Sequence, residues 1–137
     1  VTGGAGYIGA HICHKLSDLG YQVRVLDDFS TGRKERIGKF KDIIEGNILD
    51  KEIISRAVLG IDAVIHLAAK KSVEESVHNP IKYVENNLIG TNLSLERMFY
   101  NYLLTAFTRK IDPDNKIVTS FIITNPDILS SLPYLNK

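Results

Sequence analysis

The chain opens on Val1-Thr2-Gly3-Gly4-Ala5-Gly6-Tyr7-Ile8-Gly9, which we interpret as the end of a β-strand, a glycine turn and the start of a helix. Gly3, Gly6 and Gly9 form G-x-x-G-x-x-G, in which one glycine makes the tight turn, one lets backbone approach a diphosphate and one packs the helix on the strand. A helix N-terminus stabilises an anion, because its first N–H groups lack partners and its dipole is positive there. The stretch therefore predicts a diphosphate-binding turn, although a glycine-rich turn that binds nothing has the same spacing.

A carboxylate follows this turn at the distance that a dinucleotide-binding fold requires. In such folds an acidic residue about 20 positions on, at the end of the next strand, accepts hydrogen bonds from the adenosine ribose hydroxyls. Asp27, in Val25-Leu26-Asp27-Asp28, is placed there. Its charge would repel a 2′-phosphate, so the sequence favours NAD over NADP. Arg33 and Lys34 lie close downstream and keep NADP open as a second reading.

Length and composition indicate one soluble globular domain. The 137 residues are 44% hydrophobic and 24% charged, with a formal net charge of +1, and a domain of this size buries about two-thirds of its unfolded surface. This charge gives no general attraction to nucleic acid or to an anionic membrane, and no apolar run approaches the roughly 20 residues that span a bilayer. We therefore expect neither nucleic acid nor membrane as a partner.

Cysteine content and the first residue give two further expectations. Cys13 is the only cysteine in the sequence, so no internal disulfide can form and no cysteine cluster can hold zinc. A reducing, cytoplasmic location fits this composition. The sequence begins at Val1 without a methionine, and its first strand is cut almost to nothing, so we expect a fragment of a longer protein.

Helical and strand patterns alternate along the first half of the chain. The expected elements are a helix over 8–19 ended by Gly20, strands at 23–27, 43–44 and 63–67, and a helix over 51–59 capped by Asp50. This alternation with short connections predicts the α/β class, with a doubly wound parallel sheet.

A long helix is expected to start at Pro80 and to run past Gly90. Asn86 and Asn87 interrupt its polar side, and their simplest reading is as surface amides of little consequence. The apolar stripe of this helix at helical spacing consists of Ile81, Val84, Leu88, Leu95, Phe99, Leu103 and Ala106. Further on, the apolar run at 117–124 is a candidate fifth strand.

Four side chains invite a catalytic or metal-binding interpretation. His11 and His14 share a helix face near Cys13, but no carboxylate or further cysteine completes a metal site, so we favour polar surface histidines and a packed cysteine. His66 lies inside an apolar run, where a histidine with satisfied hydrogen bonds is a better reading than a catalytic one. We expect no metal.

The order and spacing of these motifs resemble the extended short-chain dehydrogenase/reductase family, and within it the UDP-glucose 4-epimerases. The resemblance covers residues 1–95 as a Rossmann dinucleotide-binding region, and 96–137 form a divergent tail that is expected to complete the helix and a fifth strand. The substrate domain of the family is expected to be lacking. The stretches that carry the resemblance are 1–9, 25–28, 61–69, 75–77, 79–80 and 85–91.

The resemblance implies which residues contact the NAD cofactor. They are Gly3, Gly6, Tyr7, Ile8 and Gly9 at the diphosphate; Asp27, Asp28, Phe29, Ser30, Thr31 and Gly32 at the adenosine; Asn47 and Ile48 at the adenine; Leu67, Ala68, Ala69, Lys70 and Lys71 at the nicotinamide-side ribose; and Asn86 with Asn87 near the cofactor. Lys71 matches the family's lysine. Asn47 stands where the family usually has Asp, and Ala69 stands where glycine is common.

The resemblance also implies an activity that this sequence cannot carry out alone. UDP-glucose 4-epimerases use bound NAD to oxidise and then reduce C4 of the sugar, with a tyrosine that deprotonates the hydroxyl and a lysine four residues on that lowers the phenol pKa. None of the six tyrosines has such a lysine. We therefore expect NAD binding without catalysis, and for the parent a UDP-sugar substrate and a homodimer. The alternatives are a non-catalytic NAD-binding module, or a fragment of a sugar-nucleotide dehydratase or dehydrogenase.

Overall fold

The computed structural model describes the backbone of residues 1–108 and the side chains of residues 1–100. In chain order its elements are α1 (Tyr7–Asp18), β1 (Val25–Asp27), the 3₁₀ turn η1 (Lys34–Ile37), β2 (Ile43–Glu45), α2 (Lys51–Val58), α3 (Val73–His78), α4 (Pro80–Val84), the π-helical turn η2 (Glu85–Ile89) and α5 (Gly90–Thr108). The candidate fifth strand at 117–124, and the tail from residue 109 on, lie outside the described residues. So do the side chains of Leu103 and Ala106.

The sheet is parallel and has Thr2 near its centre. β1 and β2 pair in parallel with Val25 opposite Ile43. Thr2 forms parallel bridges to Leu26 on one side and to His66 on the other. The order across the sheet is therefore β2, β1, Thr2 and the segment at His66, so the chain extends the sheet first to one side of Thr2 and then to the other. This is the order of a doubly wound α/β sheet, as the sequence predicts.

The strand expected over 63–67 is reduced, in the described residues, to isolated bridge positions at Ala63 and His66, of which His66 pairs with Thr2. Only Val1 and Thr2 precede Gly3, which turns the chain away from the sheet with a φ of +66°, so few residues are available to pair with the segment at His66. Side chains from 64 to 67 are half-buried rather than enclosed on both faces as expected. The strand expected over 23–27 is also shorter than predicted, and Val23 packs against the core before β1 begins.

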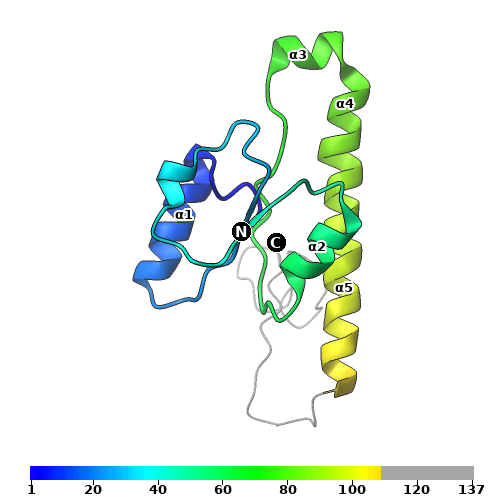
Figure 1. The fold of residues 1–137 in the computed structure, drawn as a ribbon. Helices are drawn as coiled ribbons and strands as arrows, with labels where there is room; N and C mark the ends of the chain where they lie inside the picture. The colour runs from blue at the N-terminus through cyan, green and yellow to red at the C-terminus, as the bar shows by residue number, and fades with distance from the viewer. Residues whose placement is uncertain (109–137) are drawn as a thin grey trace, which may run out of the picture.

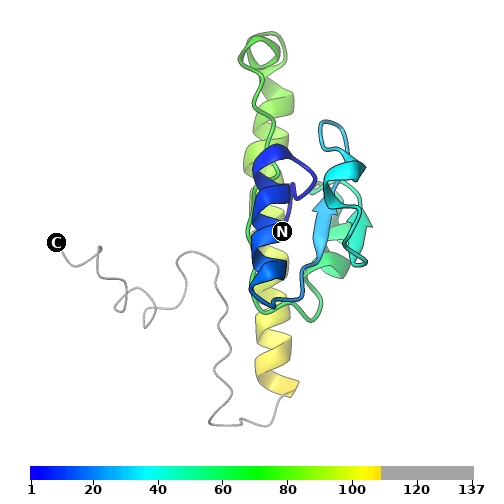
Figure 2. The ribbon, with the colours of Figure 1, turned by 90° about the vertical axis from the view of Figure 1, so that its left-hand side faces the viewer.

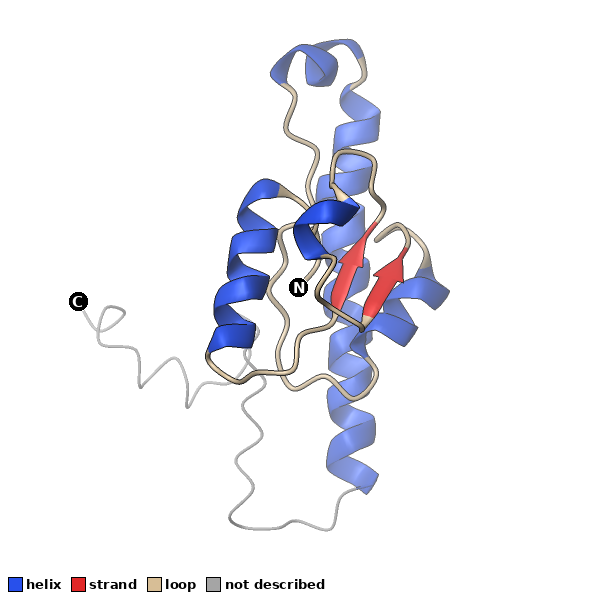
Figure 3. Ribbon diagram, turned by 60° about the vertical axis from the view of Figure 1, so that its left-hand side comes forward, coloured by secondary structure: helices blue, strands red, loops and turns tan. Residues whose placement is uncertain are grey.

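Helices cover both faces of this sheet, with α1 on one side and α2 and α5 on the other (Figure 1, Figure 3). Successive strand residues point to opposite faces, so Val25 packs in a cluster with Cys13 of α1, and Leu26 packs with Ile54 of α2 and Leu93 of α5. Figure 2 shows α4, η2 and α5 as one rod that runs the height of the described molecule. The core is thus divided into two clusters by the sheet.

Two glycines allow other segments to pack closely against the glycine turn. A Cβ at Gly3 would lie 2.7 Å from the backbone nitrogen of Ala68. A Cβ at Gly9, in the first turn of α1, would lie 2.1 Å from the carbonyl oxygen of Gly3. Because Gly9 has no side chain, α1 packs against the turn, and because Gly3 has none, Leu67 and Ala68 lie directly beside it.

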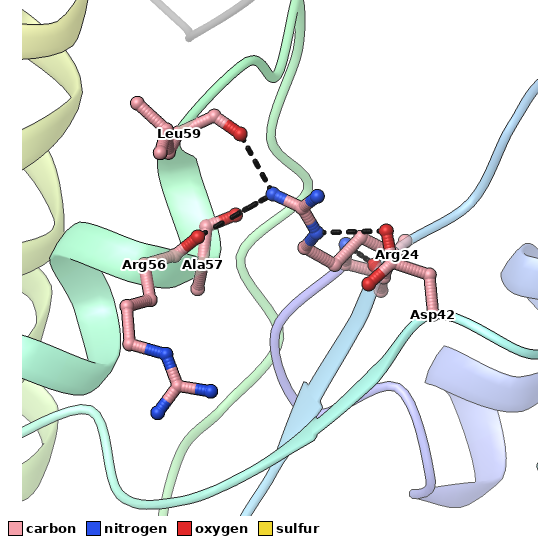
Figure 4. A network of polar contacts seen from close by, with 6 residues as sticks. Arg24, Asp42, Arg56, Ala57 and Leu59 are labelled. Atoms are coloured by element: carbon pink, nitrogen blue, oxygen red, sulfur yellow. Dashed lines mark hydrogen bonds and ion pairs between the residues drawn. The ribbon is translucent and has the colours of Figure 1, made fainter.

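One arginine joins the amino end of the sheet to α2 (Figure 4). Arg24 donates from Nε to Asp42 Oδ2, 2.8 Å away and just before β2. Its Nη1 donates to the carbonyl oxygens of Leu59 at 2.7 Å, Ala57 at 3.2 Å and Arg56 at 3.4 Å. These are carbonyls that a helix end leaves without partners. Arg24 therefore fixes the end of α2 against both strands.

The long helix begins at Pro80 and runs past Gly90, as the sequence predicts, and it contains the π-helical turn η2. At η2 the N–H of Gly90 donates to the carbonyl of Glu85, five residues back, and the separate helix α3 precedes α4. The expected apolar stripe is also exposed: Ile81 is 72% exposed and Phe99 is 57% exposed. Apolar periodicity therefore identified the helix but not the face that packs on the sheet side.

The packed face of this rod carries small and polar residues. Asn86, Gly90 and Ser94 are buried at a spacing of four. A Cβ at Gly90 would lie 2.6 Å from Cδ1 of Ile48, which follows β2. The helix presents this face because Gly90 leaves room for Ile48, which a larger residue would exclude.

The side chains that invited a metal interpretation have other partners. His11 Nδ1 lies 2.7 Å from the carbonyl oxygen of Tyr7, His14 Nε2 lies 2.8 Å from that of Arg36, and Cys13 is buried. Within the described residues no group of three His, Cys, Asp or Glu side chains is placed to hold a metal ion. None of the helices in that same part of the chain combines the length and the apolar character needed to cross a membrane.

Gly9→Ala is expected to lower the free energy of unfolding by about 1–3 kcal/mol, because its methyl group would overlap the Gly3 carbonyl and push α1 off the turn. Gly38→Ala is the matched control. Gly38 has a helical φ of −58°, and the nearest atoms to its Cβ would be 3.9 Å away, so the change is expected to be neutral or stabilising by up to about 1 kcal/mol. Urea unfolding followed by circular dichroism compares the two variants. Equal stabilities would contradict the packing of α1 on the turn.

Arg24→Lys is expected to lower the free energy of unfolding by about 1–3 kcal/mol. An ammonium group cannot reach Asp42 and the carbonyls at the end of α2 at the same time, although the charge is unchanged. Arg33→Lys makes the same change at an exposed position and serves as the control. Thermal unfolding is the measurement, and equal midpoints for the two variants would show that Arg24 does not hold α2.

Candidate functional site

A cleft lies between the carboxyl ends of the strands and the start of α1, beside Thr2, where the sheet order changes direction. Open α/β sheets bind their ligands at this place. The sequence-predicted residues that line the cleft are Gly3, Gly6, Tyr7, Ile8, Asp27, Asp28, Ser30, Thr31, Ile48, Leu67, Ala68, Ala69, Lys70, Lys71 and Asn86. These residues come from five separate parts of the chain, 3–8, 27–31, 48, 67–71 and 86, which meet at one site.

Five of the predicted residues do not line the cleft: Gly9, Phe29, Gly32, Asn47 and Asn87. Gly9 packs α1 on the turn, and Gly32 leaves room for Asp27, because a Cβ at Gly32 would lie 2.6 Å from Asp27 Oδ1. Phe29 packs against the core on the α1 side. These three residues shape the site from behind its surface.

Asn47 is engaged within the protein. Its Oδ1 accepts the N–H of Leu49 at 2.9 Å, and its Nδ2 donates to Asp28 Oδ2 at 3.4 Å. The amide thus holds the loop after β1 against the end of β2. An Asp at this position, which the family usually has, would place a second carboxylate beside Asp28.

The glycine turn offers backbone and a positive helix end to the cleft. Gly6 precedes α1 with an extended ψ of 174°, and no acidic residue occupies the first turn of the helix. The only close neighbour of a Cβ at Gly6 would be the Gly3 carbonyl oxygen, 3.2 Å away. Tyr7 is 67% exposed and Ile8 is 62% exposed. This end of the cleft suits an anion that approaches the backbone closely.

Asp27 joins the glycine turn to the end of β1. It is 7% exposed, and its Oδ2 accepts the buried N–H of Ala5 at 2.9 Å while its Oδ1 accepts the N–H of Phe29 at 2.9 Å. A carboxylate can accept about four hydrogen bonds. Asp27 therefore keeps acceptor capacity on the side that faces the cleft.

The loop after β1 is held by its own polar groups. Asp28 Oδ1 accepts the N–H of Ser30 at 2.9 Å and its hydroxyl at 2.6 Å. Phe29 adopts a φ of +55°, a left-handed conformation unusual for a bulky residue. Lys34 pairs with Glu45 at 2.6 Å, and its ammonium lies 4.8 Å from the centre of the Phe29 ring. Lys34 is therefore engaged elsewhere, which weakens the case for a 2′-phosphate at this loop.

His66 has partners for both ring nitrogens, as the sequence predicts. Thr2 Oγ1 accepts the N–H groups of Leu67 and Ala68, so its hydrogen points to His66 Nδ1, 2.8 Å away. Nε2 donates to Thr91 Oγ1 at 3.1 Å, since that hydroxyl donates to a main-chain carbonyl. Burial lowers the pKa of His66, which keeps the imidazole neutral. The residue connects the sheet to α5 and holds no charge.

The sequence did not predict two of the residues that line the cleft, and it did not predict that the amide of Asn86 is buried. Leu26 and Gly46 line the cleft without having been predicted. Gly46 directly follows β2, and a Cβ there would lie 2.7 Å from Cγ2 of Ile53, so a glycine at the carboxyl end of a strand was the available signal. Asn86 is 6% exposed and donates to Asn87 Oδ1 at 2.9 Å. The reading of Asn86 as a surface amide is therefore wrong.

Known proteins are similar to this chain in sequence and in structure. The model of the NAD dependent epimerase/dehydratase family matches residues 1–109. A UDP-glucose 4-epimerase from Bacillus subtilis (strain 168) is 44% identical over 107 residues, which cover 72% of this chain and 32% of that protein. The crystal structure of the UDP-glucose 4-epimerase from Thermus thermophilus in complex with NAD superposes with a TM-score of 0.71 at 38% identity, covering 74% of this chain and 33% of that one.

A dehydratase gives a similar match. DesIV, a dTDP-glucose 4,6-dehydratase from Streptomyces venezuelae with NAD and TYD bound, superposes with a TM-score of 0.68 at 28% identity, over 74% of this chain and 35% of that one. The chain thus spans about a third of the length of the relatives it matches. The matched family model and the arrangement of the cleft together show that the chain belongs to the NAD-dependent epimerase/dehydratase family.

Proposed function

We propose that this chain binds NAD in the cleft and supplies the cofactor-binding part of an enzyme that resembles UDP-glucose 4-epimerase. The observation that carries the proposal is the buried carboxylate of Asp27, which is bonded to the glycine turn at Ala5 and faces the cleft. A dinucleotide needs an anion site and a ribose acceptor next to one another. In this chain the hydrogen bond from the N–H of Ala5 to Asp27 holds the anion site and the ribose acceptor next to one another.

The residues present fit the cofactor. Gly6 leaves space where a diphosphate would approach the N-terminus of α1, and Asp27 has acceptor capacity for ribose hydroxyls. Ile48 offers an apolar surface beside the end of β2 for the adenine. The wall from Leu67 to Lys71 would hold the nicotinamide-side ribose, as the resemblance implies. In this proposal Gly9, Gly32 and Phe29 act as supports behind the surface of the cleft.

The proposed chemistry belongs to a longer parent. Bound NAD supplies a hydride acceptor and donor. This chain's residues bind it through the glycine turn, orient it through Asp27 and neutralise part of its diphosphate charge at the helix end. No tyrosine in the sequence has a lysine four residues on, so the chain lacks the pair that the resemblance implies for taking the proton from a sugar hydroxyl. A UDP-sugar substrate and a homodimer stay proposals for the parent, and a cytoplasmic location stays a prediction.

A non-catalytic NAD-binding module is the second candidate, and the missing Tyr-x-x-x-Lys favours it for the chain alone. Both candidates require NAD in this cleft. They differ only in whether a longer parent protein carries out catalysis. A sugar-nucleotide dehydratase parent is less well supported, because identity over 74% of this chain falls from 38% with the Thermus epimerase to 28% with the dehydratase. Release of NAD on denaturation of the purified chain, or binding on titration, tests the cofactor that all three share.

Asp27→Ala is expected to weaken NAD binding at least ten-fold, because hydrogen bonds to a charged acceptor contribute about 1.5–3 kcal/mol each. It should also raise the ratio of NADP to NAD affinity, since the repulsion of a 2′-phosphate disappears. Isothermal titration calorimetry with both cofactors is the measurement, with thermal unfolding as a check on the loss of the Ala5 hydrogen bond. Asp62→Ala, at an exposed position outside the cleft, is the control. Unchanged NAD affinity would remove Asp27 from the site.

The purified chain is expected not to interconvert UDP-glucose and UDP-galactose, even with NAD added. A coupled assay with UDP-glucose dehydrogenase measures this, and a complete UDP-glucose 4-epimerase serves as the positive control. Turnover above the buffer background would show that an unrecognised group replaces the tyrosine and the lysine.

A further inference from the structure

The ring of His66 directly precedes the nicotinamide-side wall of the cleft, residues 67–71, and is half-buried between Thr2 and α5. Its Nδ1 accepts the hydroxyl of Thr2 at 2.8 Å, and its Nε2 donates to Thr91 Oγ1 at 3.1 Å. His66 does not line the cleft. The imidazole can therefore act on a ligand in the cleft only through its neighbours.

Thr2 connects this ring to the wall. Its Oγ1 accepts the N–H of Leu67 at 3.1 Å and that of Ala68 at 3.3 Å. A hydroxyl has two acceptor positions and one hydrogen, so both positions are filled and the hydrogen goes to His66. The N–H of Leu67 also donates to the main-chain carbonyl of Thr2 at 3.0 Å. In the described part of the chain the N–H of Ala68, which lines the cleft, has no acceptor besides the Thr2 hydroxyl.

A proton taken from solvent at Nδ1 of His66 is incompatible with this arrangement. The ring then donates from both nitrogens, so the hydrogen of Thr2 loses its acceptor and Oγ1 meets a third donor. A charged donor forms the stronger hydrogen bond. Leu67 keeps the carbonyl of Thr2, so the N–H of Ala68 is the group that is displaced. The bond from Nε2 to Thr91 is retained.

Burial is the one cause that lowers the pKa of His66. The charged groups on the elements around the ring do not contribute to it; they are the Val1 ammonium, Asp27 of β1, Asp62, Lys70, Glu85 of η2, and Glu96 and Arg97 of α5. Because the folded pKa lies below the ordinary value of about 6.5, stability due to the neutral ring is lost as the pH falls below that value. Displacement of Ala68 follows at lower pH, where the folded chain itself takes up the proton.

We propose that His66 makes NAD binding by this chain sensitive to mild acid, because protonation of its ring releases the nicotinamide-side wall at Ala68. NAD binds the wall in its held form, so cofactor binding and protonation oppose one another. The inference rests on the proposed NAD site. It adds a regulatory property that belongs to a residue behind the site and not to a residue that contacts the cofactor.

The test compares the NAD affinity of the full 137-residue chain with that of His66→Asn at about pH 7.5 and about pH 5. Asparagine keeps an acceptor for the Thr2 hydroxyl and does not titrate, while every other titratable group is unchanged. We expect wild-type affinity to fall at least about three-fold in acid and that of the variant to stay within about two-fold. His78→Asn, at an exposed position on α3, is the matched control and should behave like the wild type. Titration calorimetry gives the affinities.

Hydrogen exchange followed by NMR tests the same step without a substitution and without NAD. Protection of the Ala68 N–H, relative to the unfolded rate at each pH, is expected to fall in acid. The N–H of Ala5, which donates to Asp27, is expected to keep its protection. Equal loss of protection at both groups would mean that the fold loosens in general, and would overturn the inference.

The titrations can overturn the inference in three further ways. Equal losses of affinity in the wild type and in His66→Asn would assign the pH dependence to another group. Wild-type affinity that is the same at both pH values would leave the cleft proposal standing and refute the role of His66. Absence of NAD binding by the wild type at about pH 7.5 would refute the proposed function, and this inference with it.

Discussion

The hydrogen bond from the N–H of Ala5 to Asp27 Oδ2 is the interaction on which the candidate site depends. It is buried and joins two segments that are separated by an entire helix. A buried carboxylate or N–H without a partner is strongly unfavourable, so each group needs the other in place. Gly32 is also required, because a side chain at this position would collide with the Asp27 carboxylate and displace it from the Ala5 N–H. The turn, the end of β1 and the loop after it are therefore one unit.

The opposite wall of the cleft is supported in a different way. Thr2 places its hydroxyl under Leu67 and Ala68 and directs its own hydrogen to the neutral ring of His66. The helical rod approaches from the other side through a packed face of Asn86, Gly90 and Ser94. Apolar packing is modest here, and polar side chains that satisfy main-chain groups define the wall. Such arrangements specify geometry more than they add stability.

The sequence predicted the parts of the fold that short motifs determine. The glycine turn, the carboxylate at the end of β1, the Asp50 cap of α2 and the convergence of five segments on one cleft all follow from local patterns. Features that depend on tertiary contacts were not predictable. The apolar stripe at Ile81 and Phe99 is exposed because Gly90 must admit Ile48 on the other face. The hydrogen bonds of Asn47 to Asp28 and of Asn87 to Lys70 join residues 19 and 17 positions apart, and no spacing rule encodes them.

The pairing of Thr2 with His66 also bears on how the molecule folds. These residues are 64 positions apart, whereas β1, β2 and α2 lie close together in sequence. Closing a long loop is entropically less favourable than closing a short one, so the β1–β2–α2 unit can assemble before the cleft exists. A dinucleotide that bridges both walls would then bind only the completed molecule. By mass action it would shift the folding equilibrium of the whole chain and not of one part.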